Sequence, residues 1–216
     1  LDCLVHGWDH EEDVNEHLIR VGLSNDEIQK RIIDFDPDLI GVNCQFSRQY
    51  RIYHQIFSLI KKVDKEIIVV AGGPHATVCP EEVLSDDNCD YLLSGEAEDS
   101  FRELIEALGN ESKIASIGGL GWKIDGKLHF NPNQKIIEDL DSIPFPAYHL
   151  MELDKYFGLN ASHGMRHKQR FCPIITSRGC PAKCTFCSAR QVWGNTYRMR
   201  SVENVLEEMR LLKDQY

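Results

Sequence analysis

The sequence predicts an α/β protein with a doubly wound parallel sheet, followed by a linker and the start of a second domain. Apolar segments alternate with amphipathic helical segments up to about residue 130, and residues 131–170 show little periodicity. Continuously apolar strands that alternate with helices indicate βαβ units and a sheet covered on both faces. We therefore expect one domain over residues 1–130, a linker over 131–170, and the first βα unit of an incomplete barrel over 171–216.

The first element that the apolar pattern predicts is a short strand at Leu1–Val5. Because the chain begins inside this strand and without an initiator Met, we expect it to be the amino-terminal part of a longer protein whose first βα unit is missing. Ser24 and Glu27 have the spacing of a capping box, which predicts that a helix begins there.

The remaining elements follow from apolar periodicity and from turn residues. The predicted strands are Leu39–Cys44, Ile67–Ala71, Tyr91–Leu93 and Cys172–Ser177, and Gly118–Phe130 is a predicted hairpin with Asp125-Gly126 in its turn. Two of the predicted helices lie near Pro80–Leu84 and from about Val202 to Lys213. Three further helices are predicted from the apolar residues that they carry, which are Ile28, Ile32 and Phe35 in the first, Ile52, Ile56, Leu59, Ile60 and Val63 in the second, and Phe101, Leu104, Ile105 and Leu108 in the third.

Three loops should meet at one edge of the predicted sheet. Ligands of open parallel sheets bind beyond the carboxyl ends of the strands. The segments that follow three successive strands are Cys44–Tyr50, Gly72–His75 and Gly95–Glu98. We expect them to surround a ligand.

Composition excludes several classes of function. A net charge of −10 argues against a nucleic-acid surface, and no apolar run is long enough to span a membrane. The eight cysteines lack the context of a secreted disulfide scaffold, since no signal peptide precedes them. Five are scattered and are expected to be small buried hydrophobic residues, whereas three are clustered. Both uses fit a reducing cytoplasm. The scattered five are Cys3, Cys44, Cys79, Cys89 and Cys172.

Basic residues are concentrated around the clustered cysteines. Residues 155–202 contain nine Lys or Arg and no Asp or Glu. This basic segment is either a solvated surface or a region that offsets anionic thiolates and binds a carboxylate or phosphate.

The clustered cysteines Cys180, Cys184 and Cys187 have spacings of four and three residues. Thiolates are the usual ligands of iron–sulfur clusters, and three of them would leave one iron of a [4Fe–4S] cluster open. A structural zinc site is an alternative, with His163 or His167 as the nearest additional ligand. Cysteines without any metal are the other alternative.

The segment Arg178–Cys187, which includes Phe186 before the third cysteine, resembles the signature loop of the radical S-adenosylmethionine (SAM) superfamily. The resemblance implies that the three cysteines bind a [4Fe–4S] cluster whose open iron binds SAM. It also implies that an electron from an external reductant cleaves SAM to a 5′-deoxyadenosyl radical. Tyr197, Arg198 and Arg200 resemble the family's YR-x-R stretch, which implies a position near the cluster and SAM; Trp193 is expected to be a core residue.

The first domain resembles the Rossmann-like cobalamin-binding domain that precedes the barrel in one radical SAM subgroup. The residues that carry this resemblance are Gly72–His75 after a buried strand and Gly95–Glu98 after the next. Glycines suit this place because they let the backbone approach a bulky ligand. The cobalamin contacts that the resemblance implies are Gln45, Phe46, Ser47, Gly72, Gly73, Pro74, His75, Gly95 and Glu96.

Structural roles remain open for several of these residues. Ser47 suits a helix N-cap, His75 suits a loop, and Glu96 and Glu98 suit the first turn of a helix. The Asp-x-His-x-x-Gly motif, whose His binds cobalt in some cobalamin domains, does not occur in this sequence. His6 and His10 are expected to be loop residues.

The two resemblances together imply a cobalamin-dependent radical SAM enzyme. Its nearest groups are the B12-dependent methyltransferases and the anaerobic magnesium-protoporphyrin IX monomethyl ester cyclases, so the reaction is methyl transfer or oxidative cyclisation of an unknown small molecule. No catalytic residue is predicted beyond the cluster ligands. Further SAM contacts are expected beyond Tyr216, and this chain alone is not expected to turn over. The alternatives are a radical SAM enzyme whose first domain binds no cobalamin, and a corrinoid-binding module with a structural cysteine cluster.

Overall fold

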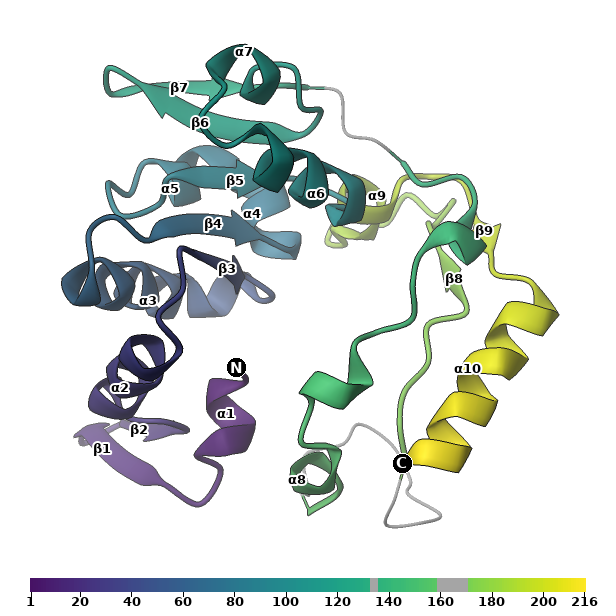
Figure 1. Cartoon of the computed structure of the whole chain (residues 1–216), viewed down its shortest axis with the longest axis horizontal. Helices are drawn as coiled ribbons and strands as arrows, with labels where there is room; N and C mark the ends of the chain where they lie inside the picture. Colours follow the sequence, from purple (N-terminus) through teal and green to yellow (C-terminus); the bar gives the residue numbers. More distant parts are fainter. Residues whose placement is uncertain (133–135, 159–170) are drawn as a thin grey trace. The chain divides into compact units, whose positions relative to one another are not determined.

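The structure is a computed structural model that describes residues 1–132, 136–158 and 171–216 (Figure 1). The chain divides into two compact units. The sheet unit comprises Phe35–Ile143 and Ser177–Arg200, and the terminal unit comprises Leu1–Asp34, Pro144–Thr176 and Ser201–Tyr216. His163 and His167 lie outside the described residues. Among the described helices, none combines the length and the apolar character that crossing a bilayer requires.

A five-stranded sheet forms the centre of the sheet unit, in the order β3-β4-β5-β6-β7. The first three strands are parallel, with Gly41 opposite Val70 and Ala71 opposite Leu92. β6 and β7 form the predicted hairpin and join the same sheet antiparallel to β5, so the sheet is mixed. The strands are β3 (Leu39–Asn43), β4 (Ile68–Gly72), β5 (Tyr91–Leu93), β6 (Leu120–Ile124) and β7 (Lys127–Phe130).

Helices cover both faces of this sheet, as predicted (Figure 1). On one face, Leu104 of α6 and Ile114 of α7 pack with Val70 and Leu93. On the other, α4 and α5 contact β4 and β5, and α3 lies beside α5, which Glu82 and His54 connect at 2.7 Å. The helices are α3 (Tyr50–Val63), α4 (Pro74–Val78), α5 (Pro80–Leu84), α6 (Glu98–Ala107) and α7 (Glu111–Ile114).

Three residues predicted to lie on buried helix faces are exposed instead. Phe35 is 82% exposed, and Ile52 and Ile105 are each 51% exposed. In α3 the buried face consists of Tyr53, Phe57, Leu59 and Ile60. Ile52 precedes Tyr53 by one residue, which rotates its side chain by about 100° around the helix and away from the sheet.

The hairpin turn at Asp125-Gly126 has the geometry that its sequence predicts. Both residues have positive φ angles, 49° and 72°. Two such residues form the type I′ turn that connects antiparallel strands without splaying them.

The terminal unit begins differently from the prediction. Leu1–Val5 is not a strand, since Cys3–His6 forms the helix α1. Asp2 caps this helix, because its Oδ1 accepts hydrogen bonds from the backbone N–H of Leu4 and Val5, both at 3.1 Å. This apolar segment is too short for its periodicity to distinguish a strand from a single helical turn. The hairpin of β1 (Glu11–Asn15) and β2 (Leu18–Val21), which periodicity did not predict, follows.

The capping box at Ser24 and Glu27 is confirmed. Ser24 N–H donates to Glu27 Oε2 at 2.8 Å and Glu27 N–H donates to Ser24 Oγ at 3.3 Å, at the start of α2 (Asn25–Phe35). The terminal unit also contains α8 (Leu153–Gly158) and α10 (Val202–Gln215), the helix predicted from about residue 202. Asn204 N–H donates to Ser201 Oγ at 3.1 Å and so caps α10.

The strand predicted at Cys172–Ser177 is much shorter than expected. Only Ser177–Arg178 is a strand, β8, and it pairs antiparallel with β9 (Arg198–Met199). Helix α9 (Ala189–Trp193) lies between them in the sequence. The apolar residues at 172–176 therefore have no regular secondary structure.

Candidate cofactor-binding site

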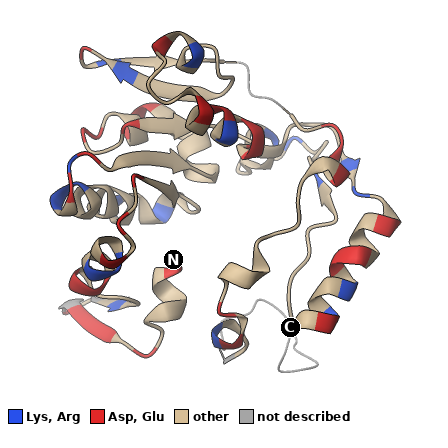
Figure 2. Ribbon diagram, in the orientation of Figure 1, with Lys and Arg blue, Asp and Glu red and all other residues tan. Residues whose placement is uncertain are grey.

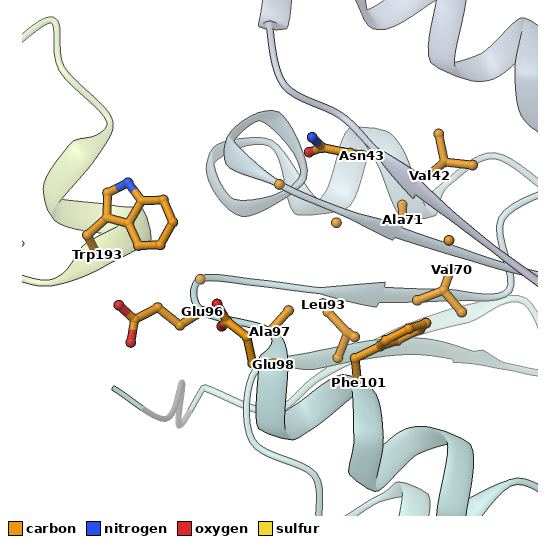
Figure 3. A pocket seen from close by; sticks show the side chains of 14 residues that line it. Val42, Asn43, Val70, Ala71, Leu93, Glu96, Ala97, Glu98, Phe101 and Trp193 are labelled. Atoms are coloured by element: carbon orange, nitrogen blue, oxygen red, sulfur yellow. The ribbon is translucent and has the colours of Figure 1, made fainter. Parts of the chain in front are cut away.

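A pocket of about 390 Å³, here called the edge pocket, lies at the carboxyl ends of β3, β4 and β5. Figure 3 shows Val42, Ala71 and Leu93 on three neighbouring strands, with Glu96 and Trp193 beyond the strand ends. Most of its wall is apolar, which suits a weakly polar ligand or the weakly polar part of one. The lining residues are Gly41, Val42, Asn43, Val70, Ala71, Gly72, Gly73, Leu93, Gly95, Glu96, Ala97, Glu98, Phe101 and Trp193.

The edge pocket contains two glycines at positions where the protein's own packing does not require glycine. A Cβ added to Gly41 would meet no atom closer than Phe101 Cζ at 3.7 Å, and one added to Gly72 none closer than Leu93 O at 3.8 Å. Both distances are ordinary van der Waals contacts, so the protein's packing alone does not exclude a Cβ at either position. The bare backbone therefore gives room to a ligand. Gly41 lies inside the apolar strand β3, and sequence reasoning missed it.

Gly73 has a different role. Its φ is +92°, and an added Cβ would lie 2.2 Å from Asn43 Oδ1. Close hydrogen bonds join the same strand ends: Cys44 N–H donates to Gly72 O at 2.7 Å and His75 N–H donates to Cys44 O at 2.8 Å. The fold itself thus requires glycine at position 73, whatever binds beside it.

Glu96, which the resemblance assigned to cobalamin, lies in a buried ion pair. Its side chain is fully buried and accepts two hydrogen bonds from Arg198, at 2.6 and 2.9 Å, and a third from Ile137 N–H at 2.8 Å. Arg198 also donates to the carbonyl oxygens of Ile137 and Trp193. The hydrogen bonds that Arg198 donates to Glu96 raise the pKa of Arg198. Such a bidentate pair fixes both partners in one geometry.

Arg178 forms a second, more exposed pair beside the first. Its Nη2 donates to Glu98 Oε1 at 2.6 Å, and its guanidinium lies 4.9 Å from the centre of the Trp193 ring. Arg178 and Arg198 are opposite one another on β8 and β9. Two like charges in this position would repel unless carboxylates compensate them, and Glu96 and Glu98 do so. The Gly95–Glu98 segment thereby holds both ends of the cysteine loop.

A second, more polar hollow, here called the loop hollow, lies along the cysteine loop and has a volume of about 570 Å³. It brings together the loop after β3, the start of α4 and the segment around Cys184 and Cys187. The sequence predicted that the first two of these segments meet. Figure 2 shows basic positions along the segment that contains α9, β8 and β9, whereas α6 carries several acidic ones. The lining residues are Gln45, Phe46, Ser47, Pro74, Val78, Lys183, Cys184, Thr185, Phe186, Cys187, Ser188, Arg190 and Gln191.

The three clustered cysteines lie on one loop without regular secondary structure. Cys184 and Cys187 are exposed and Cys180 is half-buried. A turn joins Cys184 and Cys187, since Cys187 N–H donates to Cys184 O at 3.3 Å. Cys180 N–H donates to Gly194 O at 3.2 Å. Within the described residues, no three His, Cys, Asp or Glu side chains converge closely enough to hold a single metal ion. Three accessible thiols on one loop suit the larger iron–sulfur cluster.

The scattered cysteines are partly as predicted. Cys44 and Cys89 are buried, and burial raises the pKa of each thiol to about 12. They are therefore inert small hydrophobic residues at neutral pH. Cys3, Cys79 and Cys172 are half-buried.

His75 belongs to a hydrogen-bonded row of side chains rather than to an exposed loop. Its Nδ1 lies 3.0 Å from Ser47 Oγ and its Nε2 lies 3.0 Å from Glu82 Oε2. Glu82 Oε1 in turn lies 2.7 Å from His54 Nε2, and His54 Nδ1 lies 2.6 Å from Asp86 Oδ2. We call these five residues the histidine row.

Two of the other predicted site residues, Tyr197 and Arg200, line neither cavity. Phe186 is 91% exposed although it lines the loop hollow, and Tyr197 is 57% exposed. Arg200 is half-buried. In the terminal unit, His6 is the last residue of helix α1 and not a loop residue as predicted, whereas His10 does lie in a loop. His6 pairs with Glu152 at 2.7 Å and His10 lies 3.7 Å from Glu27, so both have protein partners.

The fold of the sheet unit is similar to that of a Rossmann-like B12-binding domain. Residues 6–105 match the family described as B12 binding domain. The structure is similar to that of the cobalamin-dependent SAM radical enzyme OxsB with aqua-cobalamin and SAM bound, with a TM-score of 0.66 at 25% identity over 86% of this chain and 24% of OxsB. It also shares its fold with the radical SAM methyltransferase TsrM from Kitasatospora setae, with a TM-score of 0.65 at 19% identity over 88% of this chain and 38% of TsrM.

Curated relatives agree with this class. An uncharacterised methyltransferase of Pyrococcus horikoshii is 36% identical over 93% of this chain and 43% of its own length. Cytidylyl-2-hydroxyethylphosphonate methyltransferase of Streptomyces wedmorensis is 32% identical over 100% of this chain and 45% of its own length. Anaerobic magnesium-protoporphyrin IX monomethyl ester cyclase of Rubrivivax gelatinosus is 29% identical over 90% of this chain and 34% of its own length. The chain thus spans less than half of these relatives, and its resemblance to B12-dependent radical SAM proteins is confirmed.

The buried pair predicts a large difference between two neighbouring glutamates. Changing Glu96 to Gln leaves the Arg198 charge buried without compensation, which should cost about 3–5 kcal/mol of unfolding free energy. The matched control, Glu98→Gln, breaks a pair whose carboxylate is 37% exposed and should cost at most about 1 kcal/mol. Urea unfolding measures both. Equal losses would contradict the buried pair.

The histidine row predicts a pH-dependent contribution to stability. Burial alone would lower the pKa of His54, but its hydrogen bonds to Asp86 and Glu82 outweigh burial and raise it. Burial likewise opposes ionisation of Asp86, whose pKa is nevertheless lowered by hydrogen bonds from Asn88 and His54. The pair is therefore strongest between about pH 3.9 and 6.5, the ordinary values of the two groups.

The test compares the wild-type chain with His54→Gln by urea unfolding at several pH values. The stability difference should be largest near pH 6, and it should shrink as the pH rises through the raised pKa of folded His54, where the imidazolium is lost. It should also shrink as the pH falls through the lowered pKa of folded Asp86. A difference that stays constant from about pH 5 to 9 would show that the charge of His54 contributes nothing.

Proposed function

We propose that this chain is the cofactor-binding part of a cobalamin-dependent radical SAM methyltransferase. The observation that carries the proposal is the placement of an apolar pocket with bare backbone in the same compact unit as a three-cysteine loop. Two relatives at 36% and 32% identity are methyltransferases, which favours methyl transfer over the cyclisation of the relative at 29%. The substrate is a small molecule, and an external one-electron reductant is needed.

In this proposal the edge pocket holds part of the cobalamin. Its apolar wall excludes water, and the bare backbone at Gly41 and Gly72 allows a bulky group to lie against the strands. Glu96 takes no direct part, because its carboxylate is occupied by Arg198 and Ile137. Its task is to fix the strand end beside the pocket.

The cysteine loop binds the cluster in the same proposal. Cys180, Cys184 and Cys187 would ligate three irons of a [4Fe–4S] cluster and leave the fourth for SAM. Lys183 and Arg190 line the hollow beside two of these cysteines, where their positive charge offsets thiolate charge and attracts a carboxylate. When bound, the cluster with SAM supplies one-electron chemistry and cobalamin supplies a transferable methyl group.

Two other functions predict different binding. A radical SAM enzyme whose first domain binds no cobalamin would assemble the cluster but not take up a corrinoid. A corrinoid-binding module with structural cysteines would take up a corrinoid but not assemble the cluster. Separate tests of the two sites therefore distinguish all three.

The cluster site is tested by anaerobic reconstitution with iron and sulfide. The wild-type chain should bind about four iron and four sulfide ions and gain broad visible absorption. Cys184→Ala should lose most of this, because two thiolates do not hold the cluster firmly. Cys79→Ala is the matched control, since Cys79 lies outside the loop, and it should retain the full iron content. Stoichiometric zinc in place of the cluster would contradict the proposal.

The corrinoid site is tested by titration with hydroxocobalamin. Gly41→Leu should keep the fold, because an added Cβ there meets only Phe101 Cζ at an ordinary contact distance of 3.7 Å, yet it should weaken binding at least about tenfold by filling the pocket. Cys184→Ala should bind hydroxocobalamin like the wild type, which separates the two sites. Unchanged affinity of a folded Gly41→Leu variant would exclude the edge pocket as the binding site.

A further inference from the structure

The histidine row connects the surface of the sheet unit with the loop hollow. Ser47 lines the hollow, whereas the side chains of His54 and Glu82 are 26% and 41% exposed. Between them, the His75 side chain is only 5% exposed. Every contact along the row is between 2.6 and 3.0 Å, so the five residues form one continuous hydrogen-bonded path.

The protons along this path are fixed by its two carboxylates. Both nitrogens of His54 face carboxylate oxygens, Asp86 at 2.6 Å and Glu82 at 2.7 Å, and an ionised carboxylate only accepts hydrogen bonds, so this geometry favours a proton on each nitrogen. Burial would lower the pKa of His54, but these hydrogen bonds outweigh burial and raise it. The other oxygen of Glu82 also accepts a hydrogen bond, which requires a proton on Nε2 of His75.

A neutral His75 then has its lone pair on Nδ1, where it faces Ser47. The Ser47 hydroxyl donates its proton to this nitrogen, and the lone pairs of Ser47 Oγ remain for a ligand in the loop hollow.

The surroundings of the row hold this geometry in place. From α3, the Tyr53 ring lies 5.8 Å from the His75 ring and the Phe57 ring lies 5.8 Å from the His54 ring. The Tyr53 hydroxyl is used elsewhere: Phe46 N–H donates to it at 2.7 Å, and it donates to Phe46 O at 3.0 Å. These two bonds fix the backbone next to Ser47, so the direction of the Ser47 hydroxyl depends on His75.

We propose that His75 and Glu82 are positioning residues that make Ser47 a hydrogen-bond acceptor for an amide N–H of the bound corrinoid in the loop hollow. This inference rests on the proposed function, because it assigns one contact of the same cofactor. The lone pairs of Ser47 Oγ that remain in the hollow suit an N–H donor, and the amide groups of a corrinoid are donors of this kind. The row thereby ties cofactor affinity to a carboxylate, Glu82, that does not itself line the hollow.

The first test measures hydroxocobalamin affinity of the full chain at neutral pH. Ser47→Ala should weaken binding about tenfold, the value of one hydrogen bond, and Ser47→Thr should restore it because it keeps the hydroxyl. Glu82→Gln should cause a similar loss. The Ser47→Ala/Glu82→Gln double variant should be no weaker than Ser47→Ala, because both act through one hydroxyl. The proposal is wrong if the affinity losses of the two single variants multiply in the double variant, or if Ser47→Ala binds with wild-type affinity.

A control and a second readout separate this inference from the proposed function. Ser85→Ala removes a nearby hydroxyl that donates to Glu82 O at 2.8 Å, outside the row, and it should bind hydroxocobalamin normally. Nitrogen NMR of the histidines, without any cofactor, should show His75 protonated at Nε2 and unprotonated at Nδ1 in the wild type. A His75 protonated at Nδ1 overturns the row even if cobalamin binds. If the wild type shows the expected tautomer but binds no cobalamin, the proposed function fails and the ligand assignment fails with it.

Discussion

The buried ion pair between Glu96 and Arg198 is the constraint on which the sheet unit depends. Two charges removed from water cost several kcal/mol each, and only excellent geometry offsets that cost. Here the carboxylate accepts three hydrogen bonds and the guanidinium also reaches two carbonyl oxygens. Because Arg198 lies on β9, this pair attaches the end of the cysteine loop to the carboxyl end of β5. This one ion pair therefore holds the strand end beside the edge pocket against the end of the cysteine loop.

One short segment after β4 lines both cavities. Gly72 and Gly73 line the edge pocket, while the next residue, Pro74, lines the loop hollow. Pro74 also starts α4, where a residue without an N–H and with a fixed φ costs nothing. His75 follows within the same helical turn and is buried toward Ser47. The sharp turn after β4 thus places an apolar wall on one side and a polar row on the other.

Sequence patterns predicted the parts of the structure that depend on local chemistry. The three parallel strands of the central sheet, the capping box at Ser24 and Glu27, and the Asp125-Gly126 turn all formed as expected. The patterns failed where tertiary contacts decide. Nothing local distinguishes Ile52 from Tyr53 as the buried residue of α3, and nothing near Glu96 shows that Arg198, 102 residues later, neutralises it. The basic segment around the cysteines was a hint, since Arg178 and Arg198 both belong to it.

The glycines show why a motif alone does not define a binding site. Gly73 lies in the most recognisable part of the sequence, but its positive φ and its contact with Asn43 make it a requirement of the fold. Gly41 lies in an ordinary apolar strand, yet its missing side chain opens the pocket. A residue that serves a ligand is therefore recognised by empty space that packing does not explain. By that criterion, Gly41 beside Phe101 says more about the ligand than Gly73 of the paired glycines, which first suggested a cobalamin site.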